Sequence, residues 1–337
     1  MKKRYFPLII LLFFGVCGYA LGQSALTGIG GTESNGNAVS LSVSPEHPNP
    51  NQKVTIKALS FQVNLDNTII SWSVDGVVKL SGMGKKEFSF TTGSVGKSSK
   101  IVVSMNPADF GQITKGITIT PADMDVLWEA DTYIPPFYKG KALPSSQSSV
   151  RVIPFTSFSG KEGYYNSADL VYKWKKGYFG DAANSGYGKN IFVFNTGYTF
   201  NTDDIEVVAS TLETGISVKK IASVYIYNPK ITFYENKPLQ GVRYENSLEN
   251  SFLFSNKEFV VHAVPYFFSL DGINNNTAAY NWKLDGKKLE INPDNKNEFT
   301  FQKPSEGSGS FRLSLDIDNT GYDLQSSTKS LSIMYSN

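Results

Sequence analysis

The stretch IISWSVDG (residues 69–76) decides the fold, because close versions of it recur as LVYKWKKG (170–177) and AAYNWKLDG (278–286). Each is a short run of β-branched, aromatic and polar residues that holds one tryptophan and ends on glycine. Roughly 100 residues separate neighbouring tryptophans, which is the length of one β-sandwich domain. Repetition at a fixed period indicates tandem structural units. The three tryptophans, which we expect to be equivalent core anchors, are Trp72, Trp174 and Trp282.

The segments around each tryptophan repeat as well. In EFSF (residues 87–90), Phe88 and Phe90 alternate with Glu87 and Ser89, as in a strand with one buried and one solvated face. An apolar strand precedes each tryptophan, and a hairpin closes each copy. No stretch sustains apolar residues at the helical spacing i, i+3, i+4 and i+7. We therefore predict an all-β chain of three tandem sandwiches with almost no helix apart from the N-terminal segment.

The first copy resembles a known class of domain. Its segments SPEHPNPNQKVTIKALSF (44–61), NTIISWSVDG (67–76) and EFSFTTGSVGKSSKIVVSM (87–105) are similar to immunoglobulin-like and PKD-like domains of bacterial surface proteins. The likeness is to the relatives without an inter-sheet disulfide, because Cys17 is the only cysteine. The whole chain also resembles exported proteins of candidate-phylum bacteria that share a WEA-x-(T/S)-Y-x-PPFYKGKAL segment, here residues 128–143. The resemblance implies tandem immunoglobulin-like or PKD-like sandwiches and brings no activity with it.

Composition shifts divide the chain further. A Gly-, Ser- and Asn-rich stretch after the N-terminal segment is typical of a flexible leader. Pro121 and Pro229 each follow directly on the closing strand of a copy, so the linkers are short and we expect a rod. The predicted units are a signal peptide (1–22), a leader (23–39) and sandwiches at 40–121, 122–229 and 230–337.

The N-terminus has the pattern of an export signal. Residues 2–4 are basic, residues 8–16 are apolar, and Ala20-Leu21-Gly22 is a small-x-small cleavage site. The apolar run is shorter than the roughly 20 residues that span a bilayer. Cleavage and export to the periplasm, cell surface or medium is the prediction, with an uncleaved anchor as the alternative. A lipoprotein is disfavoured, because Val16 precedes Cys17 where a small residue is needed.

Charge excludes several classes of partner. The formal net charge of +2 becomes slightly negative once the three basic residues of the signal leave. Nothing then points to nucleic acid or to an anionic membrane surface, and any membrane contact would come from an uncleaved anchor. Aromatic residues make up 13% of the chain and charged residues only 18%, which is the composition of a packed protein.

The segment Trp128–Ser146 allows two interpretations. It matches residues 234–248 in the spacing of its aromatic and leucine positions, and Pro135-Pro136 suits an edge strand followed by a crossing loop. In this structural interpretation its aromatic side chains cover one end of the core. The alternative is ligand capture, in which exposed rings stack on a sugar or hold a Pro-rich peptide. The residues of this alternative site are Trp128, Tyr133, Phe137 and Tyr138.

Two turn sequences resemble ligand-binding loops. In DIDNTGYD (316–323), the residues Asp316, Asp318 and Asp323 have the spacing of the first half of a calcium loop. Ser327 cannot supply the bidentate carboxylate of the twelfth position, so a hairpin turn is the preferred interpretation and calcium the only candidate cofactor. GSVGKSS (93–99) lacks the first glycine of a phosphate-binding loop and links two strands, which favours a plain turn.

No constellation of residues indicates catalysis. His47 and His262 are the only histidines, they lie far apart in the sequence, and no G-x-S-x-G pattern is present. We therefore expect a non-enzymatic protein of cell-surface structure or adhesion. The alternative is a polysaccharide- or peptide-binding module using the four aromatics above, and an enzyme is a distant third. Either way the expected partner is a protein or glycan at the cell envelope, and the oligomeric state stays open.

Overall fold

The computed structural model describes residues 38–160, 163–198, 201–213, 215–305, 307–322 and 324–336. The predicted signal peptide and residues 23–37 of the predicted leader lie outside them. The described chain is almost entirely β-strand, with one short helix, α1 (Leu270–Asn274), and the 3-10 turns η2 (Leu65–Asn67), η3 (Ser167–Asp169) and η4 (Pro293–Asn295). None of the helices in these ranges has the length and apolar character needed to cross a bilayer. The all-β prediction is confirmed.

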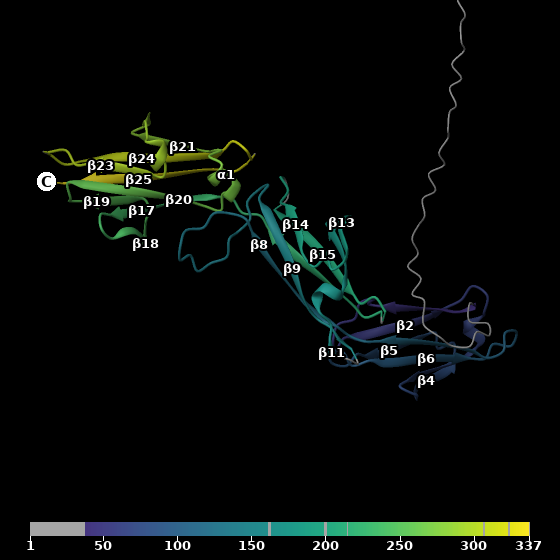
Figure 1. Ribbon diagram of the computed structural model, residues 1–337. Helices are drawn as coiled ribbons and strands as arrows, with labels where there is room; N and C mark the ends of the chain where they lie inside the picture. Colours follow the sequence, from purple (N-terminus) through teal and green to yellow (C-terminus); the bar gives the residue numbers. More distant parts are fainter. Residues whose placement is uncertain are drawn as a thin grey trace, which may run out of the picture.

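The strands form three sandwiches that follow one another along the chain (Figure 1). In the first sandwich, one sheet has the order β1-β2-β5 and the other β4-β3-β6-β7, and all neighbours are antiparallel. Its strands are β1 (Ser40–Ser44), β2 (Lys53–Leu59), β3 (Ile69–Val74), β4 (Val77–Met83), β5 (Glu87–Thr91), β6 (Ser99–Met105) and β7 (Ile113–Ile119).

The second sandwich repeats this order. Its sheets are β14-β9-β8 and β13-β12-β15-β16, with a small hairpin β10-β11 added after β9. The strands are β8 (Asp123–Ala130), β9 (Ser149–Ser157), β10 (Ser159–Gly160), β11 (Gly163–Tyr164), β12 (Val171–Lys176), β13 (Phe179–Tyr187), β14 (Phe192–Asn195), β15 (Thr202–Ser210) and β16 (Ser217–Tyr225).

The third sandwich keeps the order and adds strands at its edges. Its sheets are β18-β17-β20-β23 and β19-β25-β24-β21-β22, in which β19 pairs in parallel with β25. The strands are β17 (Lys230–Lys237), β18 (Gly241–Leu248), β19 (Ser251–Phe254), β20 (Glu258–Tyr266), β21 (Ala278–Leu284), β22 (Lys287–Lys288), β23 (Glu298–Gln302), β24 (Gly309–Asn319) and β25 (Ser326–Tyr335).

The three repeated tryptophans occupy the same place in each sandwich. They lie on β3, β12 and β21, and each is at most 1% exposed. Each indole Nε1 donates a hydrogen bond to a backbone carbonyl downstream, so the buried N–H is satisfied. The acceptors are the carbonyls of Lys85, Lys189 and Lys296, at 2.7, 2.8 and 2.9 Å. Each indole stacks on a phenylalanine of the opposite sheet, on β5, β14 or β23; these are Phe88, Phe192 and Phe299, with centroid distances of 5.8, 5.2 and 6.0 Å.

Each sandwich has its own hydrophobic core. The three large clusters of buried residues draw on residues 39–119, 122–224 and 231–333. Val39, at the end of the predicted leader, is 2% exposed and belongs to the first core. The domain boundaries themselves stay predictions. A fourth, smaller cluster lies where the second sandwich meets the third, and it leads to the candidate site.

Candidate functional site

Residues 131–148 leave the second sandwich after β8 and dock on the third. The backbone N–H of Tyr133 donates to the carbonyl of Phe268 at 2.7 Å, and the N–H of Phe267 donates to the carbonyl of Tyr133 at 2.8 Å. These paired bonds, next to an antiparallel bridge between Thr132 and Ser269, make a short strand-like contact. Figure 1 shows the segment as the teal loop that reaches from β8 towards the third sandwich.

Side chains of this segment cover the outer face of the sheet β18-β17-β20-β23. The Tyr138 ring packs edge-on against Tyr266 at 5.6 Å and Phe267 at 6.3 Å between centroids. The hydroxyls of Tyr234 and Tyr266 lie 2.7 Å apart beneath it. Residues of this fourth cluster, which we call the junction cluster, are Tyr133, Ile134, Tyr138 and Leu143 from the segment, with Tyr234, Val242, Tyr244, Val264, Tyr266 and Phe267 from the third sandwich.

A buried glutamine fastens the far end of the segment. Gln325 is 1% exposed, and its Nε2 donates to the backbone carbonyl of Ser146 at 2.6 Å. Its Oε1 accepts from the backbone N–H of Ser269 at 3.1 Å and from Nδ2 of Asn319 at 2.9 Å. Ser146 also donates from its hydroxyl to the carbonyl of Gly197 in the second sandwich, at 3.3 Å. One short stretch of backbone is therefore held from both sides.

The four aromatics of the predicted ligand site do not share one surface. Trp128 lies on β8 and packs against the second core, with the Lys141 ammonium 3.1 Å from its ring centroid. Tyr133 and Tyr138 belong to the junction cluster. Phe137 is 94% exposed and has a left-handed backbone with φ of 63°. A ligand site at these residues stays a prediction, and Phe137 is the one among them whose ring is free to meet a ligand.

The structural interpretation of the segment is right in one part and wrong in another. β8 is an edge strand, as predicted. The expectation that all four rings cap the second core is wrong, because Tyr133 and Tyr138 cover the third sandwich instead. Pro135 and Pro136 have no N–H to donate to a partner strand, and the chain turns here, with the N–H of Tyr138 donating to the carbonyl of Pro135 at 3.3 Å. The matching strand β17 continues into the hairpin β17-β18, whose turn holds Pro238.

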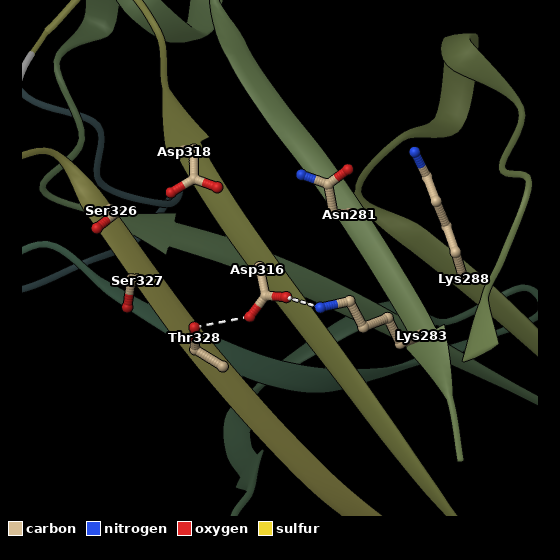
Figure 2. A pocket seen from close by; sticks show the side chains of 8 residues that line it. All are labelled: Asn281, Lys283, Lys288, Asp316, Asp318, Ser326, Ser327 and Thr328. Carbon is tan, nitrogen blue, oxygen red and sulfur yellow. Dashed lines mark hydrogen bonds and ion pairs between the residues drawn. The ribbon is translucent and has the colours of Figure 1, made fainter. Parts of the chain in front are cut away.

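Two of the three predicted calcium residues, Asp316 and Asp318, lie on the outward face of β24. Asp316 is already paired, because Lys283 Nζ lies 2.7 Å from its Oδ2 and the Thr328 hydroxyl donates to its Oδ1 at 2.7 Å (Figure 2). The Lys283 ammonium holds the pKa of Asp316 below its ordinary value. Asp318 lies beside it at the same open depression of about 630 Å³, and Asp323 lies outside the described residues. Within the described ranges no three acidic, histidine or cysteine side chains are grouped as metal ligands.

The GSVGKSS turn packs against the second sandwich. Gly96 has φ of 75°, its N–H donates to the carbonyl of Pro121 at 2.9 Å, and a Cβ there would lie 2.6 Å from Cβ of Ser159. Only glycine fits both the backbone conformation and this close approach. The predicted turn is present, but it is a contact between two sandwiches, which its sequence did not reveal.

The two histidines lie in different sandwiches. His47 Nδ1 lies 2.7 Å from the hydroxyl of Ser217 on β16, across the junction of the first and second sandwiches. Burial there lowers the pKa of His47, and Glu46 opposes the shift. His262 on β20 lies 3.0 Å from the Glu298 carboxylate. Their separation agrees with the sequence-based expectation that they do not act together.

The strand order of the sheets, together with the contacts at the two junctions, defines a tandem array of three immunoglobulin-like β-sandwiches. No family model matches the chain, and no curated protein sequence matches it either. Among solved structures, three N-terminal domains of the highly immunogenic outer capsid protein of bacteriophage RB49 are 12% identical, with 89% of this chain and 98% of that chain covered and a TM-score of 0.25.

Two further solved structures have similar values. The central fibronectin-III array of RIM-binding protein is 12% identical, covers 88% of this chain and 96% of its own, and has a TM-score of 0.29. The SGBP-B protein of a Bacteroides ovatus mixed-linkage glucan utilization locus, solved with a heptasaccharide, is 11% identical, with 90% and 71% covered and a TM-score of 0.24. Since the superpositions are this loose, the fold assignment rests on the strand order and pairing of this chain.

Proposed function

We propose that this chain is an exported, non-enzymatic protein of cell-surface structure or adhesion, in which three sandwiches act as one stiff array. The observation that carries the proposal is the docking of residues 131–148, with Tyr133 paired to Phe267 and Phe268 of the next sandwich. A flexible tether would need no such contact. Sandwiches that keep a fixed relative orientation can hold a partner protein or glycan at a set distance from the cell envelope.

The first junction supports the same proposal. His47 lies in the loop after β1 and reaches Ser217 of the second sandwich. Tyr133 lies in the loop after β8 and reaches the third. The loop after the first strand of one sandwich therefore contacts the next sandwich at both junctions. Stiffness in this array comes from the loops as well as from the short linkers near Pro121 and Pro229.

Export and shape are tested separately. The full chain is produced in a bacterial host with a C-terminal tag, and the location and N-terminal residue of the product are determined. We expect an envelope or secreted product beginning at Gln23, whereas a cytoplasmic product that retains Met1 would contradict export. Small-angle scattering of the purified chain then tests stiffness. A scattering profile that fits only an ensemble of independently reorienting domains would contradict a stiff array.

Capture of a polysaccharide or peptide by the segment Trp128–Ser146 is the second candidate. The exposure of Phe137, at 94%, is the observation that favours it. Glycan and peptide arrays probed with the chain and with Phe137→Ala test it. Saturable binding that disappears in Phe137→Ala supports a ligand role, and unchanged binding removes Phe137 from the site.

A further inference from the structure

Each sandwich has an equivalent sheet that contains its first strand. The outer faces of these three sheets differ in polarity and in whether another segment covers them. In the first sandwich this face is polar, with a Lys57–Glu87 ion pair at 2.6 Å and a hydrogen bond of 2.8 Å between Thr55 and Ser89. In the third sandwich it is apolar and lies under the segment 131–148. In the second sandwich the face combines exposed apolar side chains with the charged residues Asp125, Glu129 and Arg151, and it is open to solvent.

Strand registers show which residues are equivalent. Pro154 on β9 and Pro265 on β20 each pair with an apolar residue of the first strand, Val126 and Ile231. Counting from these prolines, Ile153 corresponds to Val264 and Phe155 corresponds to Tyr266. Two of the positions beneath the docked segment on the third sandwich therefore have apolar counterparts on the second, whereas Tyr234 corresponds to Glu129.

The outer faces of the second and third sandwiches differ in the solvent exposure of their side chains. Val264 is 0% and Tyr266 6% exposed beneath the segment. Phe155 is 55% exposed, and its neighbour Leu127, which pairs with Ile153, is 58% exposed. Isolated exposed apolar residues are ordinary, but a contiguous apolar patch marks an interaction site. The patch on the second sandwich, which we call the open face, consists of Leu127, Ile153, Phe155, Ile191 and Val193.

Loop length explains why no segment in the described part of the chain covers the open face. The segment that covers the third sandwich spans residues 131–148, between β8 and β9. The corresponding loop of the first sandwich spans only residues 45–52, between β1 and β2. From that short loop, His47 contacts Ser217 on β16, and β16 belongs to the other sheet of the second sandwich.

We propose that the open face docks a segment of another polypeptide, with the chemistry that residues 131–143 show towards the third sandwich. Such a segment carries tyrosines to cover Ile153 and Phe155, and prolines that restrict its backbone and lower the entropy lost on binding. It also carries lysines. Asp125, which pairs with Phe155, places a carboxylate at the edge of this face where the third sandwich has Lys230, while Glu129 pairs with Arg151.

The inference deepens the proposed function and rests on it, since it names the kind of partner that the array would hold. Its experiment uses only purified protein, so a failure here leaves the export result untouched. A labelled synthetic peptide with the sequence of residues 131–146 is titrated onto the chain that begins at Gln23, and anisotropy is recorded. We expect saturable binding that Phe155→Ser or Leu127→Ser weakens about tenfold, as for the anchor of a small interface.

Matched variants make the result decisive. Leu253, an equally exposed leucine of the third sandwich at 61%, should tolerate Leu253→Ser without loss of binding. A peptide with glutamate in place of its two lysines should bind more weakly, and Asp125→Lys should restore that binding. Three outcomes overturn the proposal: no saturable binding at millimolar peptide, binding that ignores Phe155→Ser, or a dimer of this chain that Phe155→Ser dissociates.

Discussion

The side-chain amide of Gln325 donates a 2.6 Å hydrogen bond to the backbone carbonyl of Ser146, and this bond ties the last turn of the third sandwich to the segment that leaves the second. Gln325→Ala leaves that carbonyl and the N–H of Ser269 buried without their partner. An unsatisfied buried group costs about 1–3 kcal/mol. We expect calorimetry to show earlier melting of the third sandwich, whereas Gln302→Ala, at an exposed position of β23, changes nothing. Equal melting of both variants would contradict the role of Gln325.

Neighbouring residues Phe137 and Tyr138 should behave oppositely. The Tyr138 ring packs on Tyr266 and Phe267, while Phe137 faces solvent. Tyr138→Ala should release the segment, so that trypsin cuts faster after Lys139 and Lys141. Phe137→Ala provides the control of similar size and should leave the cleavage rate unchanged. If both variants are cut at the same rate as the parent chain, the junction cluster does not hold the segment.

Each tryptophan should stabilise its own sandwich alone. Trp174 is 1% exposed and stacks on Phe192, so Trp174→Ala removes a large buried ring at a cost of about 3–5 kcal/mol. Calorimetry should show that one of three thermal unfolding transitions shifts to a lower temperature, while the other two keep their midpoints. Tyr178→Ala, at a hairpin position that is 99% exposed, is the control. A loss of all three transitions together would mean that the sandwiches unfold as one unit.

The first junction should weaken in acid. Burial lowers the pKa of His47 below its ordinary value of 6.5, so the docked loop favours the neutral imidazole, with Lys219 and Lys173 acting in the same direction and Glu46 and Glu206 against it. The released loop therefore binds more protons than the docked loop, and docking loses stability as the pH falls below about 6.5. Energy transfer between dyes on the first and second sandwiches checks this.

His47→Gln is the control for the acid effect, because glutamine can keep a hydrogen bond to the Ser217 hydroxyl but does not titrate. We expect its energy transfer to stay constant over the same pH range. A pH profile that is the same in the variant and in the parent chain would assign the change to another group.

Calcium binding at the last hairpin is expected to be absent. Lys283 already neutralises Asp316 at 2.7 Å, so a cation would have to displace that ammonium. Titration calorimetry should show no heat with millimolar calcium chloride. A saturable heat that Asp318→Ala abolishes would establish the site and contradict this expectation.

Local sequence patterns were sufficient to predict the architecture. Alternating residues such as Phe88 and Phe90 define a strand face within a few positions, and the repeated tryptophans mark equivalent strands because every sandwich needs a large buried anchor at its centre. The sequence therefore determined the all-β class, the three copies and the role of Trp72, Trp174 and Trp282.

Only the tertiary structure decided what the segment 131–148 does. Tyrosines and prolines that cap a core and those that dock on a neighbour have the same composition, and their role depends on partners such as Tyr266 that lie more than a hundred residues away. Gln325 and Ser146 carry no local signal either, because a single hydrogen bond between distant residues leaves no periodicity. The unequal lengths of the loops 45–52 and 131–148 gained a meaning only from the structure, in which the longer loop covers an outer face of the next sandwich and the shorter loop does not.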